Sequence, residues 1–235
     1  MDFFTELLHY YHLNASDYEQ LTRPLTYDDI RFDHRVDGLK SIVDRIHQAI
    51  AKNEKIIVYG DYDCDGIMAV SIMVKVFEML GYPVNYYVPS RYIDGYGLNT
   101  KRVEEIATKG YSLIITVDNG ISAFEAILLA KEKGIDTIVV DHHEIQEKLP
   151  DAYGILHPML SKLGAVAASG GFMSFVLATA LLDEVDPYLL SLAGISTISD
   201  MMPLLEYNRD LVRLAIEAMN EHHFPSLTKL TDGKT

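Results

Sequence analysis

The sequence predicts an α/β fold: a mainly parallel β-sheet flanked by helices on both faces, with extra helices at the N- and C-terminal ends. Two observations support this prediction. Between residues 55 and 156, short apolar segments alternate with longer helix-like segments, and the loops between them are short. The strand-like segments are apolar, which is typical of parallel strands that are covered on both faces. After Gly171 only helix-like segments follow.

Four segments, with a fifth candidate, are expected to form the strands of this sheet. Each is rich in β-branched, aromatic or aliphatic residues and lies close to a residue that favours a turn. In chain order they are KIIVY (55–59), VNYYVP (84–89), SLIITV (112–117), DTIVV (136–140) and, as the fifth candidate, YGIL (153–156).

Helical segments occupy the intervals between these strands and both ends of the chain. The segment 99–110 has Asn99 or Thr100 as its N-cap, the segment 122–134 begins with Ser122, and a glycine ends each of them. The amphipathic N-terminus predicts a first helix. The other expected helices are 66–80, 172–185, 187–199 and 208–221.

We expect three parts along the chain. Residues 1–50 should form a helical segment packed on the core, and residues 51–225 should form the α/β catalytic domain. Residues 226–235 should form a polar tail that frays. No internal repeat, low-complexity tract or Gly/Ser-rich linker separates these parts.

Composition indicates a soluble globular protein. Of 235 residues, 49% are hydrophobic and 23% are charged, which is the usual balance for such proteins. The single cysteine, Cys64, excludes an internal disulfide and a cysteine-based zinc site, and it favours a reducing compartment. The N-terminus lacks the basic and long apolar segments of a signal peptide. We therefore expect a cytoplasmic protein.

One uncharged segment, 163–182, is about as long as a membrane-spanning helix. Ser169, Gly170 and Gly171 interrupt it, so that only 172–182 is a continuous apolar helix. A buried core helix is therefore preferred over a membrane span, and no membrane partner is expected.

The formal net charge of −14, from 34 acidic and 20 basic residues, argues against tight and unaided binding of nucleic acid. Such binding usually depends on contacts of Lys and Arg with phosphate. Divalent cations held by several aspartates would neutralise part of this charge.

Acidic and imidazole side chains follow three of the expected strands. Asp61, Asp63 and Asp65 follow the first strand, Asp118 follows the third, and the triplet DHH (141–143) follows the fourth. Ligands of parallel sheets bind at the carboxyl ends of the strands, so these groups should meet at one edge. Polar loops alone explain one such aspartate easily, but not three convergent strands with paired histidines. The sequence therefore predicts a metal site.

The stretch DYDCDG (61–66) also matches the opening of a calcium-binding EF-hand loop. That loop requires a glutamate at its twelfth position, where this sequence has Ile72, and it follows a helix rather than a strand-like segment. We therefore exclude an EF-hand. In a near-extended chain the three aspartates would instead project to one side, while Tyr62 and Cys64 would point away as packing residues.

The candidate ligands suit a particular kind of ion. Mixed Asp and His ligands favour manganese over calcium, and magnesium is an alternative. Their number is large enough for two ions that share a bridging carboxylate. Such pairs of ions promote in-line displacement at phosphorus.

Several motifs in order resemble a known family. DYDCDG (61–66), VDNG (117–120) and DHH (141–143) resemble the DHH phosphoesterase superfamily. Three further stretches resemble its RecJ branch, the single-strand-specific 5′–3′ exonucleases. These are VPSRYIDGYGLN (88–99), SGGFMSFVLATAL (169–181) and LAGISTISDMMPLLEYNR (192–209), and the resemblance covers roughly residues 40–215.

The resemblance implies roles for the matching acidic and histidine positions. Asp118 is the expected bridge between two Mn²⁺ ions, and His143 is expected to meet the scissile phosphate or to assist the leaving oxygen. Asp61 is expected to support catalysis as a direct or indirect partner of the metal. The expected metal ligands are Asp63, Asp65, Asp118, His142 and Asp200.

Three further residues are expected to bind substrate. Arg91 resembles a phosphate-binding arginine, with a surface salt bridge as the alternative. Ser169 and Gly170 begin a helix, and free N–H groups at such a position favour an anion. For Ser169 a plain helix N-cap is the alternative.

The function implied by the resemblance is hydrolysis of single-stranded DNA from its 5′ end, with release of 5′-mononucleotides, in DNA repair or recombination. A metal-held hydroxide would attack the phosphodiester. Two other functions stay open. One is a phosphodiesterase that acts on short oligonucleotides or cyclic dinucleotides, and the other is a non-catalytic partner in replication or recombination.

The sequence also departs from the RecJ pattern. RecJ enzymes continue into a second domain with a Gly-Gly-Gly-His motif, which is absent here, and Val176 stands where their helix usually has a lysine. We therefore expect the part that would clamp DNA to be missing. A protein partner is one way to supply it. His222 and His223 are expected at the surface.

Overall fold

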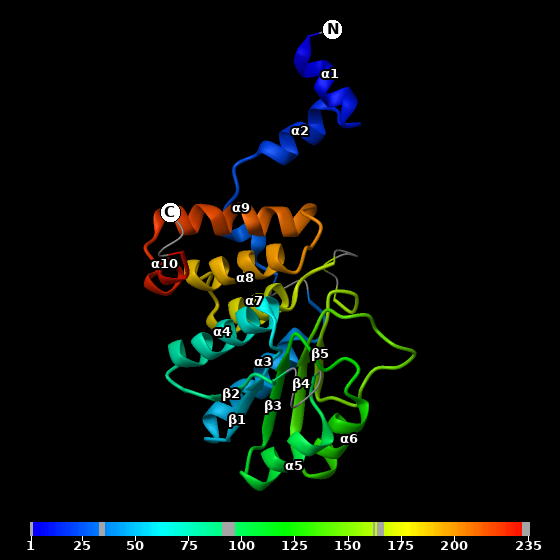
Figure 1. Ribbon diagram of the computed structural model, residues 1–235, viewed down its shortest axis with the longest axis vertical. Helices are drawn as coiled ribbons and strands as arrows, with labels where there is room; N and C mark the ends of the chain where they lie inside the picture. Colours follow the sequence, from blue (N-terminus) through cyan, green and yellow to red (C-terminus); the bar gives the residue numbers. More distant parts are fainter. Residues whose placement is uncertain (1, 33–35, 91–96, 162, 164–166, 232–235) are drawn as a thin grey trace.

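The computed structural model describes residues 2–32, 36–90, 97–161, 163 and 167–231. Five parallel strands form one sheet in the order β2-β1-β3-β4-β5, which confirms the predicted fold class. Figure 1 shows this sheet with helices on both sides. The strands are β1 (Ile56–Tyr59), β2 (Asn85–Tyr87), β3 (Leu113–Val117), β4 (Asp136–Val140) and β5 (Gly154–Leu156).

Alternate residues of the strands point into two separate hydrophobic clusters. Ile57 and Ile114 belong to the smaller cluster, with side chains of α5 (Thr100–Thr108) and α6 (Phe124–Glu132). Val58 and Ile115 belong to the larger cluster on the opposite face. Because both faces are covered, the central strands carry apolar residues at nearly every position, as the sequence suggested.

The larger cluster extends through several layers of helices. Helices α3 (Leu39–Ala51), α4 (Cys64–Met79) and α7 (Gly170–Leu182) contribute to it, and α8 (Pro187–Ser199) and α9 (Glu206–Glu221) lie beyond them, as Figure 1 shows. In α7, 11 of 13 residues are buried, so this apolar segment is a core helix. Among the described residues, no helix combines the length and apolar character needed to cross a bilayer.

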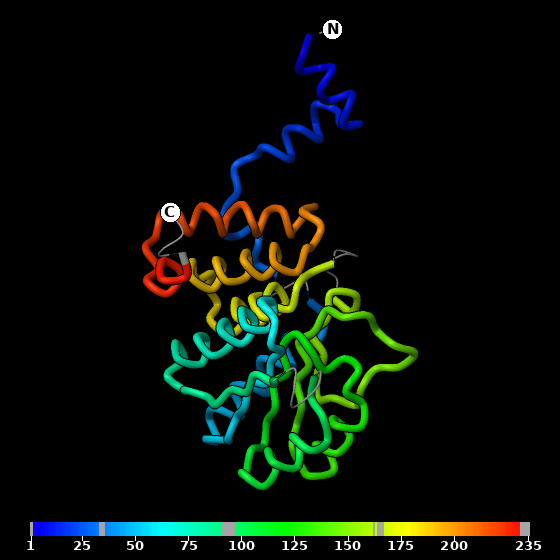
Figure 2. Tube along the Cα trace, viewed as in Figure 1, coloured from blue at the N-terminus to red at the C-terminus, as the bar shows by residue number. Residues whose placement is uncertain are grey.

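The N-terminal arm consists of α1 (Phe3–Tyr10) and α2 (Ala15–Thr22), and neither helix has a buried residue. It projects from the rest of the molecule in Figure 2. The expected packing of residues 1–50 on the core therefore holds only from the end of α2 onward, where the Leu21 carbonyl accepts from Arg209 and Arg213, and buried side chains begin in η1 (Tyr27–Ile30). Apolar side chains of the arm contact one another instead. Phe4 and Tyr18, for example, pair edge to face with ring centroids 4.9 Å apart.

Two further expectations need correction. Residues 225–231 form helix α10 (Pro225–Thr231), although we expected a polar tail from residue 226. A proline is favoured in the first turn of a helix, and this one starts α10. Helix α6 begins at Phe124 rather than at Ser122, and its N-cap residue Ala123 makes no side-chain capping bond.

The acidic stretch after β1 also differs from the near-extended chain that we expected. Asp63 is the N-cap of α4, which starts at Cys64, so Asp65 already lies in the first helical turn. Cys64 is exposed rather than packed, and Tyr62 is half-buried. The local reason is that an Asp at this position accepts a hydrogen bond from a free helical N–H, here that of Gly66 at 2.9 Å.

Candidate metal centre

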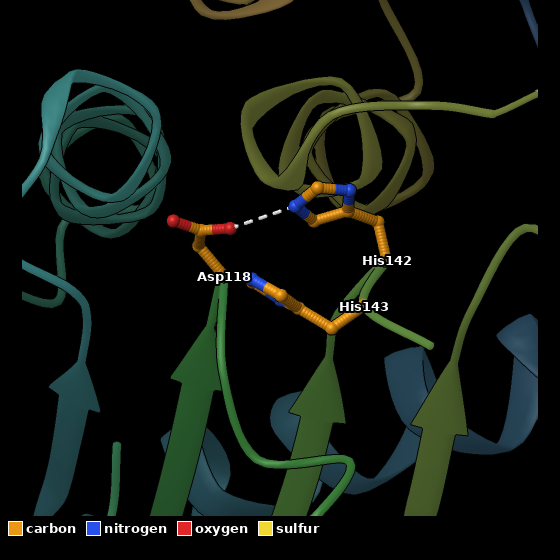
Figure 3. Close-up of side chains that lie close together, drawn as sticks. All are labelled: Asp118, His142 and His143. Carbon is orange, nitrogen blue, oxygen red and sulfur yellow. Dashed lines mark hydrogen bonds and ion pairs between the residues drawn. The ribbon is translucent and has the colours of Figure 1, made fainter. Parts of the chain in front are cut away.

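Asp118 lies directly after β3 and is 1% exposed. Its backbone has φ +59°, in the left-handed region, and such strain in a non-glycine residue is typical of functional sites. The backbone N–H donates to the carbonyl of Val140 at 2.9 Å, which fixes Asp118 against the end of β4. In Figure 3 both histidines of the following loop extend toward Asp118, and Nε2 of His142 is 3.1 Å from its Oδ1.

Asp141 organises the loop that carries these histidines. Its Oδ1 accepts hydrogen bonds from the His142 N–H at 2.7 Å and from His143 Nδ1 at 2.7 Å, while its Oδ2 accepts from the Ile121 N–H at 2.8 Å. Burial opposes its ionisation, but the hydrogen bonds from His143 and Ile121 outweigh burial and lower its pKa. The bond to Asp141 raises the pKa of His143 in return. Asp141 therefore orients His143, a role we did not assign from the sequence.

His157 is a second residue that we did not predict. It follows β5, is 1% exposed, and its Nε2–H donates to the backbone carbonyl of His143 at 2.8 Å. Its Nδ1 accepts from the Met159 N–H at 3.2 Å, so the ring is neutral, consistent with a pKa lowered by burial. The signal for His157 was its position after the fifth strand, since the same rule identified Asp118 after the third.

Asp65 is held by donors from two distant helices. The N–H of Gly170 donates to Asp65 Oδ2 at 2.7 Å, and the N–H of Gly171 donates to Oδ1 at 2.8 Å. The hydroxyl of Ser196 donates to Oδ1 at 2.5 Å. The N-terminus of α7 thus binds the carboxylate of this chain's own Asp65.

This arrangement corrects the expectation for Ser169 and Gly170. The anion at the start of α7 is Asp65, so the Gly170 N–H that we assigned to substrate is already engaged. Ser169 is fully buried, caps α7 by accepting from the Phe172 N–H at 3.1 Å, and bonds to Ser196 at 2.6 Å. These contacts agree with the alternative that Ser169 is a plain helix N-cap. Arg91 lies outside the described residues.

Gly170 is needed for a steric reason as well. A Cβ at this position would lie 2.6 Å from the Asp118 Cβ and 2.6 Å from its Oδ1. A Cβ at Gly171 would likewise lie 2.3 Å from the Ser196 hydroxyl. The two glycines therefore allow α7 to lie close to the Asp118 carboxylate and to the Ser196 hydroxyl.

All five predicted metal ligands take part in three groups of candidate ligand atoms. Within each group the atoms lie within 4.8 Å of one another, and Asp118 and His142 each belong to two groups. Such sharing fits neighbouring ions with common ligands. The groups are Asp118–His142–His143, Asp65–His142–Asp200 and Asp61–Asp63–Asp118.

Asp200 gives a direct test of whether these residues suit a cation. Its Oδ2 is buried and has no hydrogen-bond partner among the described residues, which is costly for a carboxylate without compensation. His142 Nε2 is 3.6 Å from this oxygen and 3.5 Å from Asp65 Oδ2. Several carboxylate oxygens around one imidazole nitrogen are a suitable donor set for a divalent ion such as Mn²⁺ or Mg²⁺. The residues present therefore fit a divalent metal ion.

Metal binding should release a proton from this centre. Burial, followed by the carboxylates of Asp65 and Asp63, raises the pKa of Asp118 to about 10. At neutral pH the metal-free protein then holds a proton that metal binding displaces, so the apparent metal affinity should increase with pH. Calorimetric titration of Mn²⁺ in two buffers with different ionisation enthalpies measures this release. Equal heats in both buffers would contradict the prediction.

The fold and this edge of the sheet together define a metal-binding α/β protein whose carboxylates and imidazoles suit phosphoester chemistry. The sequence of residues 55–196 matches the family described as "DHH family, N-terminal domain". Because this match covers more than half of the chain, the chain belongs to the DHH family.

Known relatives include exonucleases. The chain is 42% identical over 203 residues to the single-stranded-DNA-specific exonuclease RecJ of Bacillus subtilis, and the match covers 83% of this chain and 26% of that protein. The crystal structure of an exonuclease RecJ bound to manganese is 30% identical, with a TM-score of 0.74, and the match covers 83% of this chain and 49% of the other. That of RecJ with Mn²⁺ from Thermus thermophilus is 27% identical, with a TM-score of 0.77, and the match covers 92% of this chain and 31% of the other. The chain thus spans about a quarter to a half of these proteins.

Proposed function

We propose that this chain is the metal-dependent catalytic part of a RecJ-like nuclease that hydrolyses phosphodiester bonds of single-stranded DNA from the 5′ end. The observation that carries the proposal is the meeting of three candidate ligand groups around Asp118 and His142. RecJ relatives that are single-stranded-DNA-specific support the substrate, and RecJ structures with manganese make Mn²⁺ the proposed ion, with Mg²⁺ as the alternative. A role in DNA repair or recombination in the cytoplasm belongs to the same proposal.

The residues of this chain have distinct tasks in the proposed reaction. Asp63, Asp65, Asp118, His142 and Asp200 would hold the ions, with Asp61 beside them. When bound, divalent ions lower the pKa of a water and neutralise charge that develops on phosphoryl oxygens. The ions can do this only where rigid ligands hold them in place. For Asp65, the N–H groups at the start of α7 and the Ser196 hydroxyl fix the position of the carboxylate.

His143 is proposed as the residue that meets the scissile phosphate or the leaving oxygen. Its Nδ1 bonds to Asp141, so Nε2 is the nitrogen that would donate a proton. The raised pKa favours the protonated form of the ring. His143 also lines a cavity of about 310 Å³, together with Gly97, Ser122 and Gln146. A substrate group in this cavity would therefore lie next to the proton donor.

A phosphodiesterase that acts on short oligonucleotides or cyclic dinucleotides is the second candidate. The net charge of −14 and the small size of the cavity beside His143 favour short substrates. The non-catalytic alternative has less support, because all five predicted ligands are present and each belongs to a compact group that contains His142 or Asp118. A protein partner that completes the substrate cleft stays a prediction.

One assay distinguishes these functions. With Mn²⁺, the protein should degrade 5′-labelled single-stranded DNA to labelled mononucleotide as the first product, and should leave duplex DNA largely intact. 3′-labelled strands, RNA, dinucleotides and cyclic dinucleotides are the comparison substrates, and EDTA is the control for metal dependence. Cleavage confined to dinucleotides would support the second candidate, and no cleavage of any substrate would refute both enzymatic functions.

A further inference from the structure

The outer edge of the sheet is formed by β2. Among the described residues, this strand pairs with β1 on one side and with no strand on the other. Asn85 and Tyr86 are exposed, and 61% of the Tyr86 surface is accessible. An edge strand presents N–H and C=O groups with which a further extended chain can pair. The edge of β2 is therefore open to an added strand.

The register of β2 shows which of its backbone groups face outward. Tyr87 lies opposite Tyr59, and its carbonyl accepts from the Gly60 N–H at 3.0 Å, so the backbone groups of Tyr87 point toward β1. Successive residues of a strand direct these groups to alternate sides. The N–H and the carbonyl of Tyr86 therefore point away from β1, toward the open edge.

A cavity of about 360 Å³ lies between β2 and α4, and we call it the apolar groove. Tyr86 lies opposite Val58 of the larger hydrophobic cluster, so its side chain is on this side of the sheet. The charged lining residues, Lys75 and Glu78, pair with each other at 3.0 Å. The groove therefore suits an uncharged, apolar side chain. Its apolar lining residues are Ile67, Val70, Val74, Tyr86, Val88 and Tyr188.

A second cavity, of about 240 Å³, lies on the opposite face of the sheet between β2 and α5, and we call it the basic groove. Its charged lining residues are Arg102, Glu105 and Lys109. Glu105 pairs with Arg102, and Lys55 lies beside the groove, 5.0 Å from the centroid of the lining residue Tyr111. The two lysines thus give this groove a positive charge in a chain whose net charge is −14. An acidic side chain is the complementary group.

The two grooves meet at the open edge, because Tyr86 lines both of them. A strand added beside β2 directs its successive side chains to opposite faces of the sheet. These side chains would therefore enter the apolar groove and the basic groove in turn. In this mode of recognition, main-chain hydrogen bonds give affinity, and the pockets for alternate side chains give specificity.

We propose that the edge of β2 binds an extended segment of a partner protein in which apolar and acidic side chains alternate. None of the described residues of the candidate ligand groups lines either groove, so this surface is separate from the metal centre and adds a function to the proposed nuclease. A second copy of the chain is less suitable, because its own β2 would bring Asn85 and Tyr87 to the basic groove, and neither is acidic.

The test uses fluorescence anisotropy with a labelled peptide in which four isoleucines and four aspartates alternate, in EDTA so that no metal contributes. Wild type should bind this peptide at least tenfold more tightly than a peptide with the four isoleucines before the four aspartates. Lys109→Glu should weaken binding of the alternating peptide about tenfold. Tyr10→Ala and Lys133→Glu are the controls and should bind like wild type, because neither residue lines either groove.

The backbone contact is tested with two substitutions at one position. Proline is tolerated on an edge strand where its missing N–H would face outward, as it does at Tyr86. Tyr86→Pro should therefore bind the alternating peptide more weakly than Tyr86→Ala, which keeps the N–H. Two peptides methylated at alternate backbone nitrogens, differing in the set that is methylated, test the same contact on wild type. Methylation should weaken binding about tenfold for one set only.

Several results would overturn the proposal. Equal binding of the alternating and the block peptide by wild type, or binding of neither, excludes recognition by the two grooves. Equal effects of the two methylated sets exclude pairing with the edge of β2, even if Tyr86→Pro does not fold. A dimer of the free protein in sedimentation, lost in Lys109→Glu and unaffected by the peptide, would assign the edge to a second copy instead.

Discussion

Asp118→Asn should lower Mn²⁺-dependent hydrolysis by about a thousandfold, the largest effect expected of any single substitution here. Asp118 belongs to two of the three candidate ligand groups, so its loss affects both expected ion positions. Asparagine has nearly the same shape and tolerates the left-handed backbone at φ +59°, so the fold should be retained. Steady-state rates with single-stranded DNA, together with the bound manganese per chain, measure the effect.

The same substitution should stabilise the protein when no metal is present. The folded-state pKa of Asp118 is raised from 3.8 to about 10. Its contribution to stability is therefore complete below about pH 4 and is lost as the pH rises toward 10, because over this range the carboxyl ionises in the unfolded protein but keeps its proton in the folded one. Asparagine carries no such charge. Denaturant unfolding in EDTA at about pH 6 and about pH 8 should show a gain for Asp118→Asn that grows with pH.

Measuring both activity and stability distinguishes the loss of a metal ligand from misfolding of the variant. A variant that is inactive because it is misfolded would have a lower free energy of unfolding than wild type. An active Asp118→Asn enzyme, with unchanged manganese content, would refute the assignment of Asp118 as the shared ligand.

Asp65→Asn should destabilise the protein by about 1–3 kcal/mol even though the side-chain shape is conserved. Both oxygens of Asp65 accept hydrogen bonds, from the N–H groups of Gly170 and Gly171 and from the Ser196 hydroxyl. Asparagine would replace one acceptor by an NH₂ group that faces a donor inside the core. Since Asp65 is 2% exposed, water cannot replace the lost bond. Denaturant unfolding in EDTA measures the loss.

Asp63→Asn is the matched control for this prediction. Asp63 is exposed and caps α4 by accepting from the Gly66 N–H at 2.9 Å. Asparagine caps helices about as well as aspartate, so the free energy of unfolding in EDTA should change by less than about 0.5 kcal/mol. Both variants should bind Mn²⁺ less tightly than wild type. If Asp63→Asn were the more destabilised of the two, the roles of these aspartates would have to be exchanged.

The strands and most helices could be predicted because their local signals agree with their final environment. The apolar segments before Asp61, Asp118 and Asp141 form buried parallel strands, and helix α8 has the bounds 187–199 that its sequence indicates. Where local signals are weak, the predictions were less accurate. The exposed arm (3–22) was expected on the core, since amphipathic periodicity does not show which surface, if any, an apolar face contacts.

The sequence by itself determined the chemistry of the centre: which aspartates and histidines follow the strands, and therefore which ligand types meet at the edge of the sheet. Only the tertiary structure decided which groups hold these ligands in place. Asp65 is oriented by the start of α7, more than a hundred residues away, and His143 by Asp141 and by the buried His157. The physical reason is that backbone N–H groups and carbonyls carry no sequence signature. Their direction toward a side chain arises only when distant helices and strands pack together.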